Sequence, residues 1–353
     1  MWKQIPGWLA DPEGPIRLRP GYMPKLAPWM MRFVAAGRPS RVRELEAAGA
    51  VLCRRVYDDL LPLLNAAGLP DMLTAEGCLS LYADDAEFKA DRDHIAVLER
   101  YGFEHRLLHG KELRDLEPEI SPVIRRAVLF PQNRSVRDTQ KLVIGLVEAF
   151  KRVGGEVTSG EVVGFERGQH GVEAVRLSDG RRLASAETIL CAGAYTAGLS
   201  KLLDEAIPLE TERGYSTQIM SPGLSMRHSI IWPARAFMVT PTSGGLRVGG
   251  TVEMAGLDAA PDYRRARVLV RRAQIALPNL RADDGIEWMG HRPALPDTVP
   301  IIGPSAKHRG LYYATGHGHL GVTYAATTAR LIGDLILGHK PPVDLRPYRV
   351  DRF

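Results

Sequence analysis

The chain has 353 residues, of which 45% are hydrophobic and 25% are charged, and its formal net charge is +5. This balance is typical of an ordinary globular protein with enough chain for two domains. The 46 Lys and Arg and the 41 Asp and Glu are interleaved without a Lys-rich tract or a recognition helix, which argues against a nucleic-acid partner. The mildly basic balance is compatible with an anionic lipid surface or an acidic substrate.

The cysteines and the apolar segments bear on location. Cys53, Cys78 and Cys191 have no metal-binding or redox spacing, and their odd number indicates reduced thiols in a cytoplasmic protein. The start of the chain lacks the apolar core of a signal peptide, and no apolar run is long enough to span a membrane. Residues 26–34 form a short apolar segment flanked by basic residues. This segment is expected either to pack on the fold or to lie peripherally on the inner face of a membrane.

Apolar periodicity and turn residues predict the elements of the first two thirds of the chain. Helices are expected at 40–68, 86–101, 111–116 and 139–153, and Pro62 is expected to kink the first of them. Strands are expected at 77–83, 126–131, 161–166, 172–178, 181–184 and 187–191. Residues 207–288 carry further strand patterns interrupted by one helix at 263–277, which indicates an antiparallel sheet.

A strand, a glycine loop and a helix are predicted near the end of the chain. Residues 311–315 have the pattern of a buried strand, residues 316–321 form the loop, and a helix follows it up to Gly338. The face of this helix expected to be buried carries Val322, Ala325, Ala329, Ile332 and Ile336. Unpaired backbone N–H groups at the helix start, beside glycines that permit close approach, make a site for a cofactor or an anion.

The glycines of this loop satisfy the pattern G-x-G-x-x-G, but the context of a dinucleotide fingerprint is missing. That fingerprint needs a second strand with an acidic residue roughly 20 residues further on. Only 15 residues follow Gly338, they contain three prolines, and none of them forms an apolar strand pattern. The loop is therefore expected to hold a part of a ligand other than a pyrophosphate.

Residues 290–321 contain G-x-R-P-x-x-P-D-x-x-P-I-I-G followed by a strand and T-G-H-G-x-x-G. This pattern resembles the C-terminal region of the FAD-dependent D-amino acid oxidase superfamily, in particular its D-amino acid dehydrogenase and glycine oxidase branch. The resemblance implies an α/β (α+β) fold in which an FAD-binding domain of the glutathione-reductase-like type is joined to an antiparallel-sheet substrate domain. It further implies that the glycine loop contacts the flavin ring end of FAD.

The N-terminus departs from that family pattern. Members begin with a strand, a glycine turn and a helix that hold the FAD pyrophosphate, whereas residues 1–25 contain no such fingerprint. The FAD-binding domain is therefore expected to be N-terminally truncated. The expected organisation is a helical region at 1–68, substrate-domain parts at 69–136 and 207–285, and FAD-domain parts at 137–206 and 286–353.

The resemblance also implies roles for individual residues. Arg292 is expected to bind the substrate carboxylate, because a guanidinium forms two parallel hydrogen bonds with that group. Arg213 and Tyr215 are further candidates for the substrate wall, and Met238 and Thr251 are weaker ones. The expected cofactor contacts are Val163, Ala192, Gly193, Gly316, His317, Gly318, His319, Leu320, Gly321, Val322 and Thr323. A metal at His317 and His319 is not expected, since no further ligand lies near them in the sequence.

The activity implied is hydride transfer from the substrate Cα to FAD, which converts a D-amino acid or a related small amino or imino acid to an imino acid and then a keto acid. Oxygen or a quinone would take the electrons. Two alternatives stay open: a non-catalytic fragment or subunit that needs the FAD-pyrophosphate segment, and a sarcosine oxidase-like secondary amine oxidase.

Overall fold

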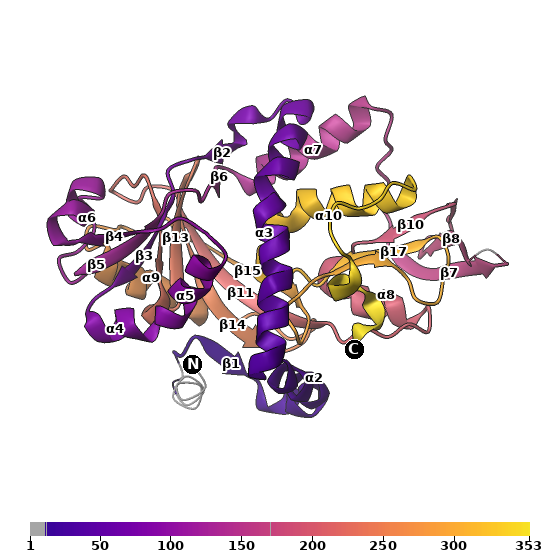
Figure 1. Ribbon diagram of the computed structural model, residues 1–353, viewed down its shortest axis with the longest axis horizontal. Helices are drawn as coiled ribbons and strands as arrows, with labels where there is room; N and C mark the ends of the chain where they lie inside the picture. Colours follow the sequence, from indigo (N-terminus) through magenta and orange to yellow (C-terminus); the bar gives the residue numbers. More distant parts are fainter. Residues whose placement is uncertain (1–10, 12, 170) are drawn as a thin grey trace.

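The computed structural model describes residue 11 and residues 13–169 and 171–353. These residues form two mixed α/β units that lie side by side, with the long helix α3 (Pro39–Ala67) between them (Figure 1). Leu52, Val56, Leu60 and Leu64, at helical spacing, are buried against the rest of the fold. The predicted mixed α/β fold is thereby confirmed, although α3 continues through Pro62 up to Gly68.

The larger unit is built on a nine-stranded sheet, and most of its neighbouring strands are antiparallel. Two pairings, β12 with β3 and β1 with β14, are parallel. In spatial order the sheet contains β15 (Ile286–Ala294), β11 (Glu210–Ile219), β14 (Gly245–Met254), β13 (Phe237–Thr242), β12 (Ser229–Trp232), β3 (Cys78–Tyr82), β5 (Arg126–Phe130) and β4 (Arg106–His109), with β1 (Ile16–Leu18) beside β14. The predicted antiparallel sheet is therefore present, with two parallel additions.

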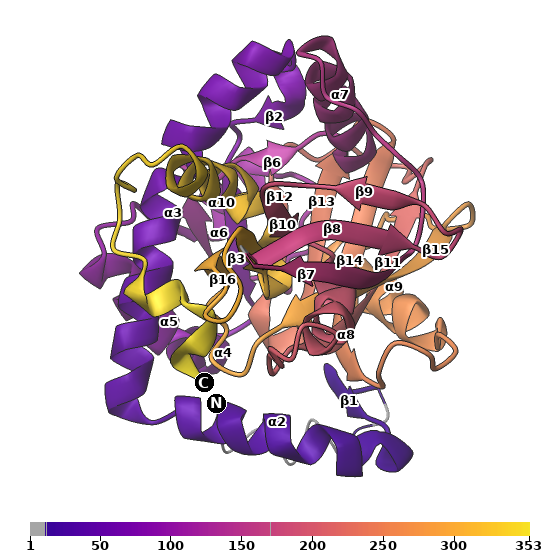
Figure 2. The same ribbon diagram turned by 90° about the vertical axis from the view of Figure 1, so that its right-hand side faces the viewer.

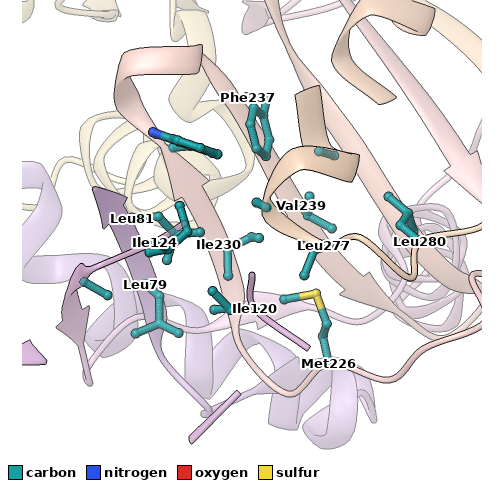
Figure 3. Close-up of a cluster of buried hydrophobic side chains, with 14 of the residues drawn as sticks. Leu79, Leu81, Ile120, Ile124, Met226, Ile230, Phe237, Val239, Leu277 and Leu280 are labelled. Atoms are coloured by element: carbon teal, nitrogen blue, oxygen red, sulfur yellow. The ribbon is translucent and has the colours of Figure 1, made fainter. Parts of the chain in front are cut away.

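The main hydrophobic core lies between this sheet and helix α9 (Arg264–Ala276). Strand residues such as Ile230, Phe237 and Val239 meet Leu277 and Leu280, which follow the helix (Figure 3). Further helices on this unit are α4 (Asp85–Ala90), α5 (Arg92–Arg100) and α6 (Gly110–Leu116). The helix predicted at 86–101 is divided into α4 and α5, because Asp91 leaves the helical conformation between them.

The smaller unit contains short sheets flanked by helices (Figure 2). One sheet has the order β10 (Thr188–Leu190), β17 (Leu311–Thr315), β16 (Ile301–Pro304), in which β10 and β17 are parallel. Another contains β7 (Val162–Gly168), β8 (Gly171–Leu177) and β9 (Arg182–Ala184), and β2 (Leu73–Thr74) pairs with β6 (Ser135–Val136). The helices are α7 (Thr139–Arg152), α8 (Thr196–Lys201) and α10 (Gly321–Ile336).

Strand β15 changes the expected domain organisation. The sequence divides the chain at residue 286, but residues 286–294 pair with β11 along the whole strand and so belong to the larger sheet. This pairing joins segments distant in sequence, which local periodicity does not reveal. Arg292 consequently projects from the larger unit, although the glycine loop that follows it belongs to the smaller one.

Helix α2 (Met23–Ala36) contains the short apolar segment 26–34. Leu26 and Trp29 are buried, and the indole N–H of Trp29 donates to the carbonyl of Ala294 at 3.3 Å. Met31 and Val34 remain exposed on the other side of the helix. The helix therefore packs beneath the end of β15. Among the helices of the described residues, none is both long and apolar enough to cross a membrane.

Candidate active site

One face of the larger sheet carries the polar residues that surround Arg292. Pairing places Glu212 opposite Arg292, Gly214 opposite Gly290, and Ser216 opposite Trp288. Because side chains alternate along a strand, these residues share one face, whereas Arg213 and Tyr215 point to the other. This division decides which of the predicted residues can act together.

Arg292 is held in a narrow position on that face. One of its terminal nitrogens donates to the carbonyl of Thr251 at 3.0 Å. Gly214 leaves room for the guanidinium, since a Cβ there would overlap it. Thr251 has a φ of 60°, a left-handed conformation that is rare for a β-branched residue and characteristic of constrained functional regions. Burial lowers the pKa of Arg292, and the nearby Glu212 opposes that shift.

Glu212 is the residue of this site that sequence reasoning missed. Burial raises the pKa of its carboxyl group, while the positive charge of Arg292 counteracts the rise. The ring nitrogen Nδ1 of His319 lies 3.5 Å from its Oε2 atom. The only indication in the sequence was an acidic residue one position before Arg213, on a strand whose alternation places it beside Arg292. An acidic group and a basic group thus face the same space.

The glycine loop lies against the end of β15, where residues 294 and 317 form an isolated antiparallel bridge. Gly316 and Gly318 have φ values of 78° and 51°. A Cβ on Gly316 would overlap Leu295, whereas nothing lies within 4 Å of the corresponding position on Gly318. The two glycines therefore serve different purposes: Gly316 allows close packing of the chain, and Gly318 presents open backbone.

The residues that follow in the loop have distinct surroundings. His317 bonds through Nε2 to the hydroxyl of Thr328 at 2.9 Å, and burial lowers its pKa to about 4. Partial burial and the charge of Arg292 also lower the pKa of His319, although 55% of that side chain is exposed. Leu320 and Val322 are exposed, and no side chain caps the first turn of α10, where Gly321 and Thr323 lie. Unpaired N–H groups of that turn can bind a ligand.

Ala192 and Gly193 are brought close to this loop. The hydroxyl of Thr315, at the end of β17, donates to the carbonyl of Gly193 at 3.3 Å. Gly193 has a φ of 56° and open space in front of it, and Tyr195 meets His291 of β15 with ring centroids 6.4 Å apart. Val163 lies on β7, in a separate small sheet, with its side chain 48% exposed.

Arg213 and Tyr215 occupy a different environment from the one expected. Arg213 is fully buried and donates to the carbonyls of Gly256 at 2.9 Å and Leu257 at 3.1 Å. The hydroxyl of Tyr215 donates to Glu253 at 2.6 Å and accepts from the backbone N–H of Asp262. Strand alternation places both on the α9 side of the sheet, so they do not line the face of Arg292. They hold the loop after β14 in place.

The acidic residue of the P-D pair in the C-terminal pattern is also structural. Asp297 is buried and forms an ion pair with Arg352 at 2.8 Å, which ties the last residues of the chain to the turn after β15. Within the described parts of the chain, no group of three or more His, Cys, Asp or Glu side chains has the arrangement of a metal site. His317 and His319 turn instead towards Thr328 and Glu212.

Two hollows lie outside the face of Arg292. A cavity of about 770 Å³ is lined by Arg19, which follows β1, by Glu253 of β14 and by residues of the loop after β14, among them Asp262. A second, of about 460 Å³, lies between β10, β17 and α10. It is lined by Ala325, Ala329 and Ile332. Of the apolar face predicted for α10, Val322, Ala325 and Ala329 are exposed, whereas Ile332 is buried. The helix also buries Tyr324, Thr328 and Leu331, and Tyr324, Leu331 and Ile332 pack in one cluster with residues of α3.

The second hollow adjoins the free side of β10. Among the described residues β10 pairs only with β17, and Ile189 and Cys191 of this edge are exposed. An unpaired edge beside apolar side chains is a surface that proteins commonly cover. The N-terminal truncation inferred from the sequence stays a prediction, and part of the segment on which it rests, residues 1–10 and 12, lies outside the described residues.

The fold and the site together define a mixed α/β protein with a charged sheet face beside a glycine loop and an uncapped helix. Residues 18–335 match the family model DAO, FAD dependent oxidoreductase. The chain is 31% identical to a D-amino-acid oxidase from Bradyrhizobium diazoefficiens over 358 aligned residues, which cover 100% of this chain and 85% of that protein. It is 29% identical to D-amino acid dehydrogenase 2 from Ralstonia nicotianae, covering 99% and 85%.

Solved structures show the same fold. Glycine oxidase from Geobacillus kaustophilus superposes with a TM-score of 0.73 at 20% identity, covering 88% of this chain and 82% of that one. L-proline dehydrogenase from P. horikoshii also has a TM-score of 0.73 at 20% identity, with coverage of 86% and 82%. The chain therefore belongs to the DAO family of FAD dependent oxidoreductases, which confirms the family, the enzyme class and the cofactor expected from the sequence.

The residues present fit FAD. Gly193 and Gly318 both expose backbone to open space, beside the N-terminus of α10 that no side chain caps. Such an arrangement lets a planar, electron-rich group approach main-chain N–H groups closely. The sequence predicts that residues 192–193 and 316–323 hold the cofactor, and their exposed backbone is compatible with that prediction.

Proposed function

We propose that this chain oxidises the amine of a small amino acid, with a D-amino acid as the first candidate. The observation that carries the proposal is the pair Arg292 and Glu212 on one sheet face, beside the open backbone of Gly318. An α-amino acid has a carboxylate for Arg292 and an ammonium group for Glu212. Two fixed charges on a rigid sheet would orient its Cα towards the glycine loop.

The chemistry needs little else from the protein. FAD, when bound, accepts the hydride that leaves the substrate Cα. As the C–H bond breaks and the amine gives up its protons, the substrate becomes an imino acid, and water hydrolyses this to a keto acid and ammonia. Arg292 holds the carboxylate throughout. Glu212, whose pKa is raised by burial, is placed to bind the ammonium group and to accept a proton from it.

The proposal also covers the electron acceptor and a membrane contact. The electrons taken up by FAD would pass on to oxygen or to a quinone. Helix α2 offers the exposed side chains of Met31 and Val34 with Arg32 between them, which suits a peripheral contact with an anionic membrane surface. Vesicle co-sedimentation with and without Met31→Ser would test that contact, and equal binding by both proteins would remove it.

The experiment that tests the function begins with the cofactor. The purified 353-residue chain is desalted and its flavin-to-protein ratio is measured. Because β10 has an open edge, we expect a ratio well below one that rises when FAD is added. The FAD-loaded protein is then given D-alanine, L-alanine, glycine and sarcosine with an artificial electron acceptor, and ammonia and keto acid are measured.

Each outcome of that experiment has a defined meaning. Ammonia formed from the D-enantiomer supports the proposal, and a preference for sarcosine would favour a secondary amine oxidase instead. A protein that stays fully loaded with FAD yet oxidises none of these compounds, or any of the D-amino acids, would contradict the proposed activity. A protein that never retains FAD would favour the alternative of a non-catalytic subunit.

A further inference from the structure

Arg247 lies on the same sheet face as Arg292 and has no role in the site described above. It belongs to β14 and pairs with Gln218 of β11, whose side chain shares the face of Ser216. Its Nε and Nη2 atoms donate to the hydroxyl of Ser216 at 3.3 and 3.2 Å. Its guanidinium stacks on the ring of Trp288 at 5.3 Å from the centroid. The side chain is therefore held in one position.

The charge of Arg247 has no counter-charge on the protein. Among the described residues no carboxylate lies within ion-pair distance of it, and its partners are a hydroxyl group and an aromatic ring. Burial lowers its pKa, which reflects the cost of keeping a cation away from water. Trp288 is 55% exposed, so the space in front of the pair is open to a solute. A fixed, partly buried and uncompensated guanidinium is suited to binding an anion.

The charges on this face do not balance for a simple amino acid. Around the open space, the residues of β11, β14 and β15 on this face carry two cations, Arg292 and Arg247, and one anion, Glu212. The second acidic residue of the face, Glu210 at the start of β11, accepts a hydrogen bond from the hydroxyl of Tyr22 at 2.8 Å. A neutral-side-chain amino acid brings one carboxylate and one ammonium group, which match Arg292 and Glu212. Arg247 is then left without a partner. A substrate with a second carboxylate would complete the pairing.

The spacing of the two guanidinium groups fits such a substrate. Arg292 reaches over Gly214, and Arg247 reaches over Ser216. Two residues along a strand separate these positions by roughly 7 Å. The two carboxyl carbons of a four- or five-carbon dicarboxylic acid lie roughly 4 to 5 Å apart when extended. A guanidinium at each end of that length can therefore bind one carboxylate each.

We infer that Arg247, positioned by Ser216 and Trp288, binds the side-chain carboxylate of an acidic amino acid and so selects dicarboxylic substrates at the site of Arg292. The inference rests on the proposed function, because it names the substrate class of that same site. The mildly basic charge of the chain agrees with an acidic ligand. Ser216 and Trp288 act through Arg247 and are positioning residues.

The test compares D-glutamate with D-glutamine, which have nearly the same shape and differ in the charge of the side chain. In the FAD-loaded enzyme we expect kcat/KM for D-glutamate to exceed that for D-glutamine. Arg247→Gln should lower the ratio of the two values about 10- to 150-fold, as expected for a lost charge-assisted contact. Arg247→Lys, which keeps the charge but not the forked geometry, should lower it less.

Arg235→Gln is the matched control. Arg235 also stacks on a tryptophan, Trp232, at 5.3 Å from the centroid, but it is exposed and lies outside this face. Its substitution should leave the ratio unchanged. Thermal melting of each variant checks that it is folded. Calorimetric titration of D-glutamate and D-glutamine into the FAD-loaded proteins gives a second readout that does not need turnover.

The outcomes separate this inference from the proposed function. Oxidation of D-glutamine equal to that of D-glutamate, or a ratio unchanged in Arg247→Gln, would overturn the inference while the amine oxidation stands. If no amino acid is oxidised, the proposed function fails. The calorimetric titrations then show whether Arg247 binds the side-chain carboxylate. Tighter binding of D-glutamate that is lost in Arg247→Gln would support its role, and equal binding of both ligands would overturn it.

Discussion

Replacing Arg292 with alanine is the most direct perturbation of the candidate site. The guanidinium is partly buried, and of its five donors one terminal nitrogen contacts the Thr251 carbonyl, so two parallel N–H groups remain for a carboxylate. Losing such a charge-assisted contact should weaken substrate binding by about 2 to 4 kcal/mol. This corresponds to a fall of about 30- to 900-fold in kcat/KM.

The structure places the expected loss in the upper part of that range. Arg292 also lowers the pKa of Glu212, whose carboxyl group burial pushes upwards. Without the arginine, Glu212 keeps its proton to a higher pH and attracts the substrate ammonium group less strongly. The acid limb of the pH profile for kcat/KM should therefore shift upwards in Arg292→Ala. A change confined to KM, without this shift, would mean that the two residues act separately.

The assay combines steady-state kinetics with the flavin absorption spectrum of the purified variant. Arg292→Lys keeps the positive charge but lacks the forked guanidinium, so its kcat/KM should lie between those of the unaltered protein and Arg292→Ala. Arg346→Ala, at an exposed position paired with Asp344, controls for the removal of an arginine. The reasoning is refuted if Arg292→Ala retains its flavin spectrum and shows an unchanged kcat/KM.

Three further predictions concern the loop, the buried carboxyl group and the opposite sheet face. Gly318→Val should lower the flavin-to-protein ratio, because a branched side chain would fill the open space before a backbone with φ of 51°; an unchanged ratio would contradict the loop assignment. Burial raises the pKa of Glu212 above the ordinary 4.5. The folded protein therefore loses stability as the pH rises from about 4.5 through the raised pKa, because Glu212 must then ionise in its buried position. Glu212→Gln should therefore raise Tm at about pH 8 and leave it nearly unchanged at about pH 4, and thermal scans with equal differences at both would refute this. Arg213→Met should lower the free energy of unfolding by about 3 to 5 kcal/mol, because it leaves Glu253 short of a buried partner, and a denaturant titration with an unshifted midpoint would count against it.

Local patterns in the sequence predicted the elements that depend on neighbouring residues. Strand β17 has the predicted bounds, and helix α7 starts at the cap supplied by Asp138, which accepts from the N–H of Lys141 at 3.0 Å. Turn chemistry and period are sufficient there, because both are written in a few consecutive residues. The family and the cofactor followed from the C-terminal pattern for the same reason.

The composition of the sheet face could not be predicted in that way. Adjacent positions 213–216 suggested one cluster, but a strand sends consecutive side chains to opposite faces, so Arg213 became structural. Glu212 and Arg247 join Arg292 only because β11, β14 and β15, which are separated by long stretches of sequence, pair in one sheet. The sequence next to any one of these three residues does not indicate that the other two lie beside it in the fold.

The same strand pairing places the proposed substrate-binding residues and the proposed FAD-binding residues in different units. Strand β15 carries Arg292 as part of the larger sheet, and within a few residues the chain enters the smaller unit that contains the glycine loop. Under the proposed function, the groups that would recognise the substrate stand on paired strands, and the groups that would hold FAD stand on loops and a helix start. No described hydrogen bond joins Arg292 to residues 316–323. The two sets meet at His319, which lies 3.5 Å from Glu212 and senses the charge of Arg292, whereas Gly193 and Gly318 have open space in front of them. Substitutions on the sheet face should thus change substrate preference at constant flavin content, whereas substitutions at Gly193 or Gly318 should change flavin content first and activity as its consequence. If Arg292→Ala released FAD, or if Gly318→Val altered the preference among substrates at full flavin loading, the two functions would have to share residues and this division would be wrong.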